Sequence, residues 1–168
     1  MRIGSVTAPI PNDPAADVAI AEFNVYAGGS ATPVYGTPLS RTGWTPTASN
    51  TSPWLNDALA NMLDGDFSTR YSSGAGQAPG QWVEVDMGQA QTFDTVALDS
   101  GGSTGDYARS ADFYVSSDGT NWTKVASIAS GQPVEVVTFA TQTARYIKVV
   151  NTGTAGNWWS IAEFNVYD

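Results

Sequence analysis

A seven-residue stretch near the end of the chain also occurs near its beginning. Residues 161–167 and residues 20–26 both read Ile-Ala-Glu-Phe-Asn-Val-Tyr, 141 residues apart in a chain of 168. An identity of this length is very improbable by chance, and the spacing is that of a whole domain rather than of a solenoid unit. We therefore expect one complete domain, preceded by the terminal strands of an earlier copy.

Composition divides the chain into three segments. Residues 1–29 contain one alternating run, Val18 to Tyr26, which predicts the terminal strands of a preceding repeat or an accessory strand. Residues 30–38 carry Pro and Gly and are typical of a linker, so the complete domain is expected at residues 39–168. Because Phe23 and Val25 are costly to leave in water, we expect their strand to pack on the domain or on a second molecule.

The charge and the missing residue types exclude several functions. Seven Lys and Arg against 16 Asp and Glu give a net charge of −9, which disfavours nucleic acid and makes an anionic membrane an improbable partner. His and Cys are both absent, so the usual general base and any thiol nucleophile are missing and we expect no enzyme. A surface rich in Ser, Thr, Gly and Asn is typical of secreted, extracellular bacterial binding domains.

The pattern of residues 39–168 predicts an all-β domain. Short runs rich in Val, Thr, Phe, Tyr and Trp alternate with Gly, Asn, Asp and Ser clusters, and Asp118-Gly119 is a strong hairpin signal. Only Trp54 to Leu63 is compatible with a short helix. An antiparallel β-sandwich or jelly-roll of about eight strands fits best. The expected strands are 81–87, 92–99, 111–116, 122–126, 134–139, 145–151 and 161–167.

Alternation along these strands predicts which side chains face the core. Phe164 and Val166 are expected to point inward. Trp158 and Trp159 are adjacent, so in an extended segment only one of them can be buried, and we expect Trp159 inside and Trp158 facing a ligand. The other aromatic residues assigned to the core are Trp44, Trp82, Trp122, Phe139 and Tyr146.

Five motifs in order resemble the discoidin, or coagulation factor 5/8 type C, domains, which have a galactose-binding-like fold. They lie at residues 61–71, 79–88, 113–122, 145–149 and 158–167. Their style is similar to that of bacterial family 32 carbohydrate-binding modules. The chain lacks the cysteines that pair in animal members, and it has Tyr71 where the family usually has Trp.

An Asp-Gly-Asp turn is the strongest metal signal in the sequence. Asp64 and Asp66 flank Gly65, and three readings are open from spacing alone: a Ca²⁺ site, a solvated surface turn, or a catalytic carboxylate pair. The resemblance implies a structural calcium ion. The six implied ligand positions are Asn61, Asp64, Asp66 and Thr69, closed by Ala162 and Glu163.

The resemblance places the ligand site among loops at one end of the sandwich, at residues 72–80, 99–109 and 152–159, with 45–57 at the rim. Sugars are bound by aromatic faces and a few polar side chains. The aromatic candidates are Trp54, Tyr107 and Trp158, and the polar candidates are Gln77, Asp106, Arg109 and Asn157. Trp54 is equally compatible with a lid over the core, and Arg109 with an ion pair to Asp106 or Asp112. We expect Arg70 to brace its loop from within.

The resemblance implies a non-catalytic carbohydrate-binding module that tethers a polysaccharide-degrading enzyme to its substrate. Galactose-binding members often use a His in the second of these loops, and this chain has none, which favours a glucan or chitosan type of ligand. The expected partners are polysaccharide or oligosaccharide and neighbouring catalytic or repeat domains. The alternative is a cell-surface adhesion or phospholipid-binding domain of the same fold.

Overall fold

The computed structural model describes residues 36–168. The expected strand at 18–26, its packing and the boundary at residue 29 lie outside the described residues. The described part contains eight strands and two short 3₁₀ helices. Their bounds are β1 (Thr45–Ala48), η1 (Leu55–Asp57), η2 (Leu59–Leu63), β2 (Tyr71–Gln77), β3 (Trp82–Asp99), β4 (Ala111–Ser116), β5 (Thr123–Ile128), β6 (Val134–Asn151), β7 (Ala155–Ile161) and β8 (Glu163–Tyr167).

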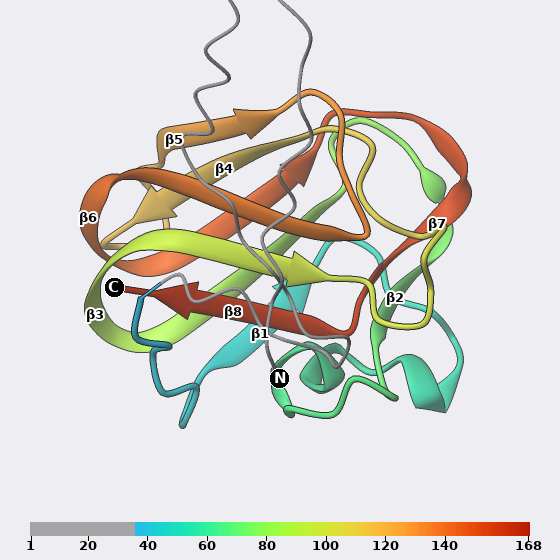
Figure 1. The fold of residues 1–168 in the computed structure, drawn as a ribbon, viewed down its shortest axis with the longest axis horizontal. Coiled ribbons are helices and arrows are strands. Elements are labelled where there is room, and N and C mark those ends of the chain that lie inside the picture. Colours follow the sequence, from blue (N-terminus) through green and yellow to red (C-terminus); the bar gives the residue numbers. More distant parts are fainter. Residues whose placement is uncertain (1–35) are drawn as a thin grey trace, which may run out of the picture. The chain divides into compact units, whose positions relative to one another are not determined.

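The strands form an antiparallel sandwich, as predicted. Six strands make one sheet in the order β1-β3-β6-β4-β5, with β8 also paired to β3, and β2 pairs with β7 in a second sheet. Figure 1 shows β3 and β6 curving together at one side of the domain, so that each contributes to both layers. The ends of β2 and β7 and the loops beside them therefore lie at the opposite side of the view from this curve.

The bends in β3 and β6 explain an error in the sequence analysis. Residues 81–87 and 92–99 were expected as two strands but belong to one, and the same holds for 134–139 and 145–151. The β3–β6 register shifts between Asp86 and Gln91, where Gly88 adopts φ +79° and donates its N–H to Asp86 Oδ1 at 2.8 Å. A β-bulge bends a strand without ending it. The polar and glycine residues at this point therefore mark a bend rather than a turn between strands.

The core lies between the two layers and follows the predicted alternation. Phe164 and Val166 are buried, and so is Trp159, which is 1% exposed. Trp44 is also buried, and Phe139 packs edge-on against Phe93 with 5.9 Å between ring centroids. The largest buried side chains are Met62, Tyr71, Phe93, Phe113, Ile147, Trp159, Ile161 and Phe164.

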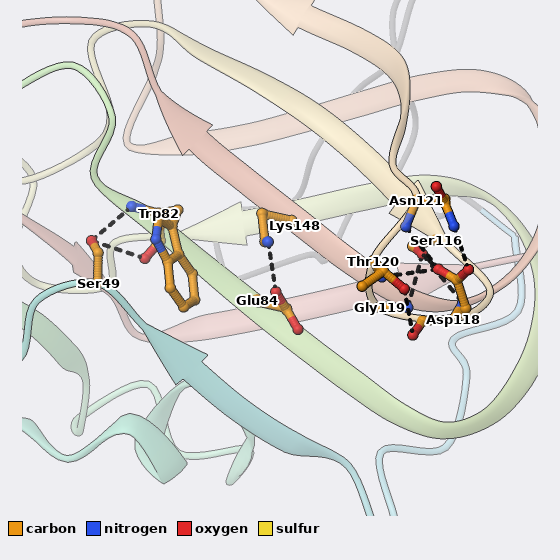
Figure 2. A network of polar contacts seen from close by, with 9 residues as sticks. All are labelled: Ser49, Trp82, Glu84, Ser116, Asp118, Gly119, Thr120, Asn121 and Lys148. Atoms are coloured by element: carbon orange, nitrogen blue, oxygen red, sulfur yellow. Dashed lines mark hydrogen bonds and ion pairs between the residues drawn. The ribbon is translucent and has the colours of Figure 1, made fainter.

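Three aromatic residues assigned to the core lie elsewhere. Trp82, Trp122 and Tyr146 are half-buried, because the residues that alternate with Trp82 and Tyr146 along their strands fill the interior. Lys148 Nζ lies 3.9 Å from the Trp122 ring centroid and 5.1 Å from that of Trp82, a cation–π arrangement. The same ammonium group donates to Glu84 at 2.9 Å (Figure 2). These rings are covered by a cation on the outer face of the sheet instead of by the opposite layer.

The predicted Asp-Gly hairpin connects β4 and β5. Gly119 adopts φ +74°, a conformation that side chains with a Cβ disfavour. The Asp118 carboxylate accepts the N–H groups of Thr120 at 2.9 Å and Asn121 at 2.8 Å, and the Asn121 amide at 2.7 Å (Figure 2). These hydrogen bonds hold the pKa of Asp118 well below its usual range. The turn is therefore stabilised by an ionised carboxylate.

The helical prediction for residues 54–63 is confirmed in part. Two 3₁₀ helices, η1 and η2, occupy this range, and the backbone is extended at Ala58 between them. Within residues 36–168, no helix combines the length and the apolar character needed to cross a membrane.

Candidate functional site

A pocket of about 450 Å³ lies beside η1, the segment before β2, and β7. It contains Trp54 and Trp158, two of the three aromatic residues expected to bind a ligand. Trp54 is 64% exposed, so the lid-over-the-core reading of this residue does not hold. The residues that line the pocket are Trp54, Asn56, Asp57, Ser68, Thr69, Arg70 and Trp158.

The position of Trp158 follows from the alternation of β7. Trp159 enters the core, so its neighbour points to the other side of the strand. Trp158 pairs with Gly76 of β2, and its carbonyl accepts a hydrogen bond from the Gln77 amide at 3.1 Å. The backbone of Trp158 is thus fixed by the sheet while its indole lines the pocket.

An acidic and a basic side chain meet in the pocket. Asp57 Oδ1 lies 3.6 Å from Arg70 Nε, and Asp57 is only 8% exposed. Among residues 36–168, the buried Nε of Arg70 has no hydrogen-bond partner, whereas Nη1 donates to Ser103 Oγ. Arg70 braces the loop through Ser103, as expected, and its side chain also lines the pocket, which was not expected.

Asp57 was missed in the sequence, although its spacing carried a signal. Its N–H donates to the carbonyl of Trp54 at 3.1 Å in the turn that forms η1. In a 3₁₀ helix, side chains three residues apart lie over one another. An acid three residues after an exposed Trp in such a turn therefore shares its face, but sequence alone did not distinguish this turn from an α-helix.

Four other predicted residues form a second cluster of contacts. The Arg109 guanidinium lies 4.0 Å from the Tyr107 ring centroid, and Nη2 donates to Gly105 O at 2.8 Å and Asn157 Oδ1 at 3.5 Å. Asp106 Oδ1 accepts the Asn157 amide at 3.4 Å. Asn157 precedes Trp158 in β7, but none of these four residues lines the pocket. The Arg109 side chain thus bonds to carbonyl and amide oxygens rather than to Asp106 or Asp112, which does not support the ion-pair reading, and its contact with a ligand stays a prediction.

Gln77 lies behind the site rather than in it. It is 2% exposed, and its Nε2 donates to the carbonyls of Tyr107 at 2.9 Å and Trp158 at 3.1 Å. Its Oε1 accepts the N–H of Arg109 at 3.1 Å. All three partners are main-chain groups of residues predicted to contact the ligand. The amide is fully used inside the protein, so the prediction that Gln77 binds the ligand directly is wrong, and the residue instead ties two site loops together.

Four of the six residues expected to hold a metal ion lie in one segment beside this pocket, residues 61–69, and the other two lie at the start of β8. Asp64 Oδ1 accepts the N–H of Asp66 at 2.8 Å, and Asp64 Oδ2 accepts the Thr69 hydroxyl at 2.7 Å. Asn61 donates its amide to two carbonyls, those of Asn56 and Arg70. Ala162, the fifth position, is buried, and its N–H donates to Asp99 O at 2.7 Å.

Glu163, the sixth position, is an almost fully buried carboxylate with one unused oxygen. It is 1% exposed, and Oε2 accepts a hydrogen bond from Arg41 Nη1. Within the described part of the chain, Oε1 has no hydrogen-bond partner. Burial, with a smaller contribution from the negative charge of Asp64, raises the pKa of Glu163.

These residues fit a hard cation in donor chemistry. The described chain holds no group of three or more His, Cys, Asp or Glu side chains arranged as metal ligands. Any ion at this turn must therefore take carbonyl or hydroxyl oxygens besides Asp64 and Glu163, as Ca²⁺ does. A buried carboxylate oxygen without a donor, beside a second carboxylate, leaves negative charge that such an ion would neutralise.

Comparison with known proteins identifies a domain family that matches this chain. The model of the F5/8 type C domain family matches residues 45–164. A galactose oxidase of Gibberella zeae is 29% identical over 144 residues, which are 79% of this chain and 21% of that enzyme. The chain thus spans about a fifth of the length of the curated relatives that it matches.

Solved structures give the same fold. Chitosan-binding module 1 of a chitosanase/glucanase from Paenibacillus sp. IK-5 is 33% identical, with a TM-score of 0.64 over 74% of this chain and 94% of that module. Chitosan-binding module 2 of the same enzyme, in complex with chitotriose, is 30% identical, with a TM-score of 0.65 over 74% and 95%. A family 32 module from Clostridium perfringens in complex with GalNAc-β-1,3-galactose is 20% identical, with a TM-score of 0.68 over 79% and 100%, and shows the fold alone.

Proposed function

The chain belongs to the F5/8 type C domain family, and from that premise we propose that it is a non-catalytic carbohydrate-binding module. The observation that carries the proposal is the pocket between Trp54 and Trp158, with Asp57 and Arg70 beside the two indoles. Aromatic faces stack on the C–H surface of a sugar ring, and polar side chains fix its hydroxyl groups. This set of residues provides both.

The charged pair gives the pocket donors and an acceptor for sugar hydroxyls. The side chain of Arg70 is 37% exposed and offers guanidinium donors to hydroxyl oxygens, and the carboxylate of Asp57, 10% exposed, would accept a hydroxyl or ammonium proton. A ligand that brings several such groups on one face replaces water at both side chains. A pyranose ring has this arrangement.

We propose a ligand of the glucan or chitosan type. The similarity to two chitosan-binding modules, at 30% and 33% identity, supports this class. The net charge of −9 and the carboxylate of Asp57 attract a cationic glucosamine polymer. A neutral glucan would use the same hydroxyl contacts without the charge attraction. The two ligands can therefore be distinguished by adding salt, which should weaken the binding of chitosan but not that of glucan.

The proposed role is to hold a neighbouring polysaccharide-degrading enzyme on its substrate outside the cell. A shallow pocket with two stacking residues is expected to bind with a Kd of about 0.1–1 mM, and linked copies gain by avidity. The repeat of residues 20–26 at 161–167 supports tandem modules in the parent protein.

We further propose that a structural calcium ion is bound by the turn around Asp64 and Asp66 together with Ala162 and Glu163. Asn61 and Thr69 would complete the oxygen set. The ion would neutralise the buried carboxylate and connect the turn to the start of β8. A chelator should then lower the melting temperature and added Ca²⁺ should restore it, and an unchanged melt in EDTA would contradict the calcium proposal.

Pull-down on insoluble polysaccharide tests the sugar proposal. The protein is expected to sediment with insoluble chitosan or glucan, and chitotriose titrated by calorimetry should give a measurable Kd. Trp158→Ala should abolish both signals, whereas Trp122→Ala, on the outer face of the sheet, serves as the matched control and should retain them. Unchanged binding by Trp158→Ala would place the sugar site elsewhere.

A second candidate function rests on one exposed apolar pair. Leu55 is 96% exposed next to Trp54 at the tip of η1, an arrangement that also suits insertion into a lipid surface. The net charge of −9 opposes binding to anionic lipid. Sedimentation with phosphatidylserine vesicles separates the two functions. The phospholipid-binding alternative would be favoured if the protein sedimented with vesicles, lost this binding in Leu55→Ser, and bound no sugar.

A further inference from the structure

The segment of residues 61–70 carries the proposed calcium ligands and one wall of the pocket at the same time. Asn61, Asp64 and Asp66 belong to the turn assigned to calcium, whereas residues 68–70 line the pocket. The segment contains only ten residues, so the two sites share one piece of backbone. Direct hydrogen bonds connect side chains of the calcium turn to residues of the pocket wall.

The first bonds come from Asn61. Its Nδ2 donates to the carbonyls of Asn56 and Arg70, both at 2.9 Å. Both acceptors belong to residues that line the pocket: Asn56 lies in η1, and Arg70 directly precedes β2. A single amide therefore holds η1 and the start of β2 at a fixed separation.

Three more bonds involve the carboxylates of the turn. Asp64 Oδ2 accepts the hydroxyl of Thr69 at 2.7 Å. Asp66 Oδ1 accepts the N–H of Ser68 at 2.9 Å and its hydroxyl at 2.6 Å. A carboxylate oxygen has two lone pairs, so Asp64 Oδ2 can accept its bond from Thr69 and face a cation at once, whereas Asp66 Oδ1 uses both lone pairs on Ser68.

A separate observation indicates that this turn takes a cation. Glu163 Oε1 is buried and has no hydrogen-bond partner among residues 36–168, although Arg41 binds the other oxygen of the same carboxylate. A Cβ built on Gly65 would lie 3.5 Å from Arg41 Nη2, which places Arg41 and the turn in contact. The unused oxygen therefore belongs to the same cluster as the turn.

We propose that calcium binding at this turn and sugar binding in the Trp54–Trp158 pocket are energetically coupled. The coupling rests on the proposed function, because it concerns the same pocket. The ion orders the carboxylate of Asp64 and the backbone of the turn that carries Asp66, and these two residues fix Thr69 and Ser68 in the pocket wall. A sugar that binds only one conformation of this wall then costs less conformational entropy on binding, because the ion has already ordered the wall.

Linkage makes the coupling reciprocal. If calcium raises the affinity for the sugar by some factor, the sugar must raise the affinity for calcium by the same factor. Coupling between sites typically amounts to about 5- to 150-fold. The two sites share Thr69 and the hydrogen bonds of one short segment. We expect a factor of about five or more, at the low end of this range.

Calorimetric titration of the whole chain tests the proposal with chitotriose and Ca²⁺ as the two probes. The Kd for chitotriose should rise about fivefold or more when Ca²⁺ is replaced by EDTA. The Kd for Ca²⁺ should fall by the same factor when chitotriose is saturating. Equal chitotriose affinities in the two buffers would overturn the coupling and leave the sugar-binding function intact.

Two variants separate the coupling from a general loss of structure. Glu163→Gln removes the cation-binding charge without altering a residue of the pocket wall, and it should bind chitotriose in Ca²⁺ as weakly as the wild type does in EDTA. Asp64→Asn provides a second variant on the turn. Glu84→Gln, on the outer face of β3, is the matched control and should keep the calcium response.

The remaining outcomes are also decisive. A Glu163→Gln variant that still responds to Ca²⁺ would overturn the proposal. A wild-type protein that binds chitotriose but no Ca²⁺ would overturn the coupling alone. A wild-type protein that binds chitotriose in neither buffer would overturn both the coupling and the proposed chitosan-type ligand.

Discussion

The carboxylate of Asp57 and the guanidinium of Arg70 meet in the pocket that Trp54 and Trp158 also line, with 3.6 Å from Oδ1 to Nε. Neither residue was expected at the site, yet together they provide its charged groups. The pair is separated by more than a hydrogen bond, so each partner retains capacity for a ligand. The pocket is therefore polar in its chemistry as well as aromatic.

Replacing Arg70 tests this pair. Arg70→Met removes the buried donors and leaves Asp57 without a counter-charge, and hydrogen bonds to charged groups contribute about 1.5–3 kcal/mol each. We expect chitotriose affinity to fall by about tenfold or more, measured by calorimetry. Arg145→Met, which removes the partner of Asp86 on the outer face, is the control and should bind as the wild type does.

The two adjacent tryptophans should respond in opposite ways. Trp159 fills the core, so Trp159→Ala should lower the free energy of unfolding by about 3–5 kcal/mol in urea titration. Trp158→Ala should lower it by less than half as much, because its indole lines the pocket and is partly exposed. Similar losses for both variants would show that Trp158 is a core residue.

Gln77 should behave as a support rather than a contact. Gln77→Leu leaves three main-chain groups without their side-chain partner, each loss costing about 1–3 kcal/mol when the group stays buried. We expect a fall of about 2 kcal/mol or more in unfolding free energy. Gln142→Leu, at a less buried position, is the control. A variant of normal stability with weakened chitotriose binding would instead restore Gln77 as a ligand contact.

Arg41 should stabilise the domain through Glu163. Arg41→Ala leaves a buried carboxylate unpaired, and removing one partner of a buried ion pair costs about 3–5 kcal/mol. Because Arg41 itself is partly exposed, we expect a value near 3 kcal/mol. Thermal melts should show the loss, and the double variant Arg41→Met, Glu163→Gln should recover part of it. A single variant as stable as the wild type would contradict this role.

The Asp118 turn should contribute to the loss of stability in acid. Its pKa is lowered by hydrogen bonds from Asn121 and Thr120, so its contribution is complete above the unfolded-state pKa and is lost as the pH falls toward the lowered folded value. Asp118→Asn should be less stable than the wild type at pH 7. The difference in urea midpoint should shrink below about pH 4, and a difference independent of pH would contradict the assignment.

The sequence was sufficient for the fold class because most local signals agreed with it, although the bends in β3 and β6 were interpreted as ends of strands. The alternation that placed Phe164 and Val166 inside and the Asp118-Gly119 turn are local patterns, and both are present in the structure. The outer-face aromatics were misassigned for a physical reason. Trp82 and Trp122 have the composition of core residues, and only the tertiary contact with Lys148 shows that a cation covers them.

The pocket was predictable in part. Trp54 and Trp158 were proposed because Trp54 is an aromatic residue in a polar loop, and because only one of the adjacent residues Trp158 and Trp159 can be buried. Asp57 and Arg70 were not, since their meeting depends on how η1 is placed against the segment before β2, over a separation of 13 residues. Gln77 was assigned to the ligand because the sequence alone does not distinguish a polar side chain that contacts a ligand from one that hydrogen-bonds to the backbone.

The pairing of the two ends of the described domain has a mechanical consequence. Thr37 and Asp168 exchange hydrogen bonds at 3.3 and 3.2 Å, and Leu39 N–H donates to Val166 O at 2.9 Å. In this antiparallel geometry, a force applied at Thr37 and Asp168 pulls the two segments apart sideways. The hydrogen bonds then break one after another instead of sharing the load. Pulled at these two points, the domain should yield first at this edge, at a low force, while the pocket and β3 still hold their native pairing.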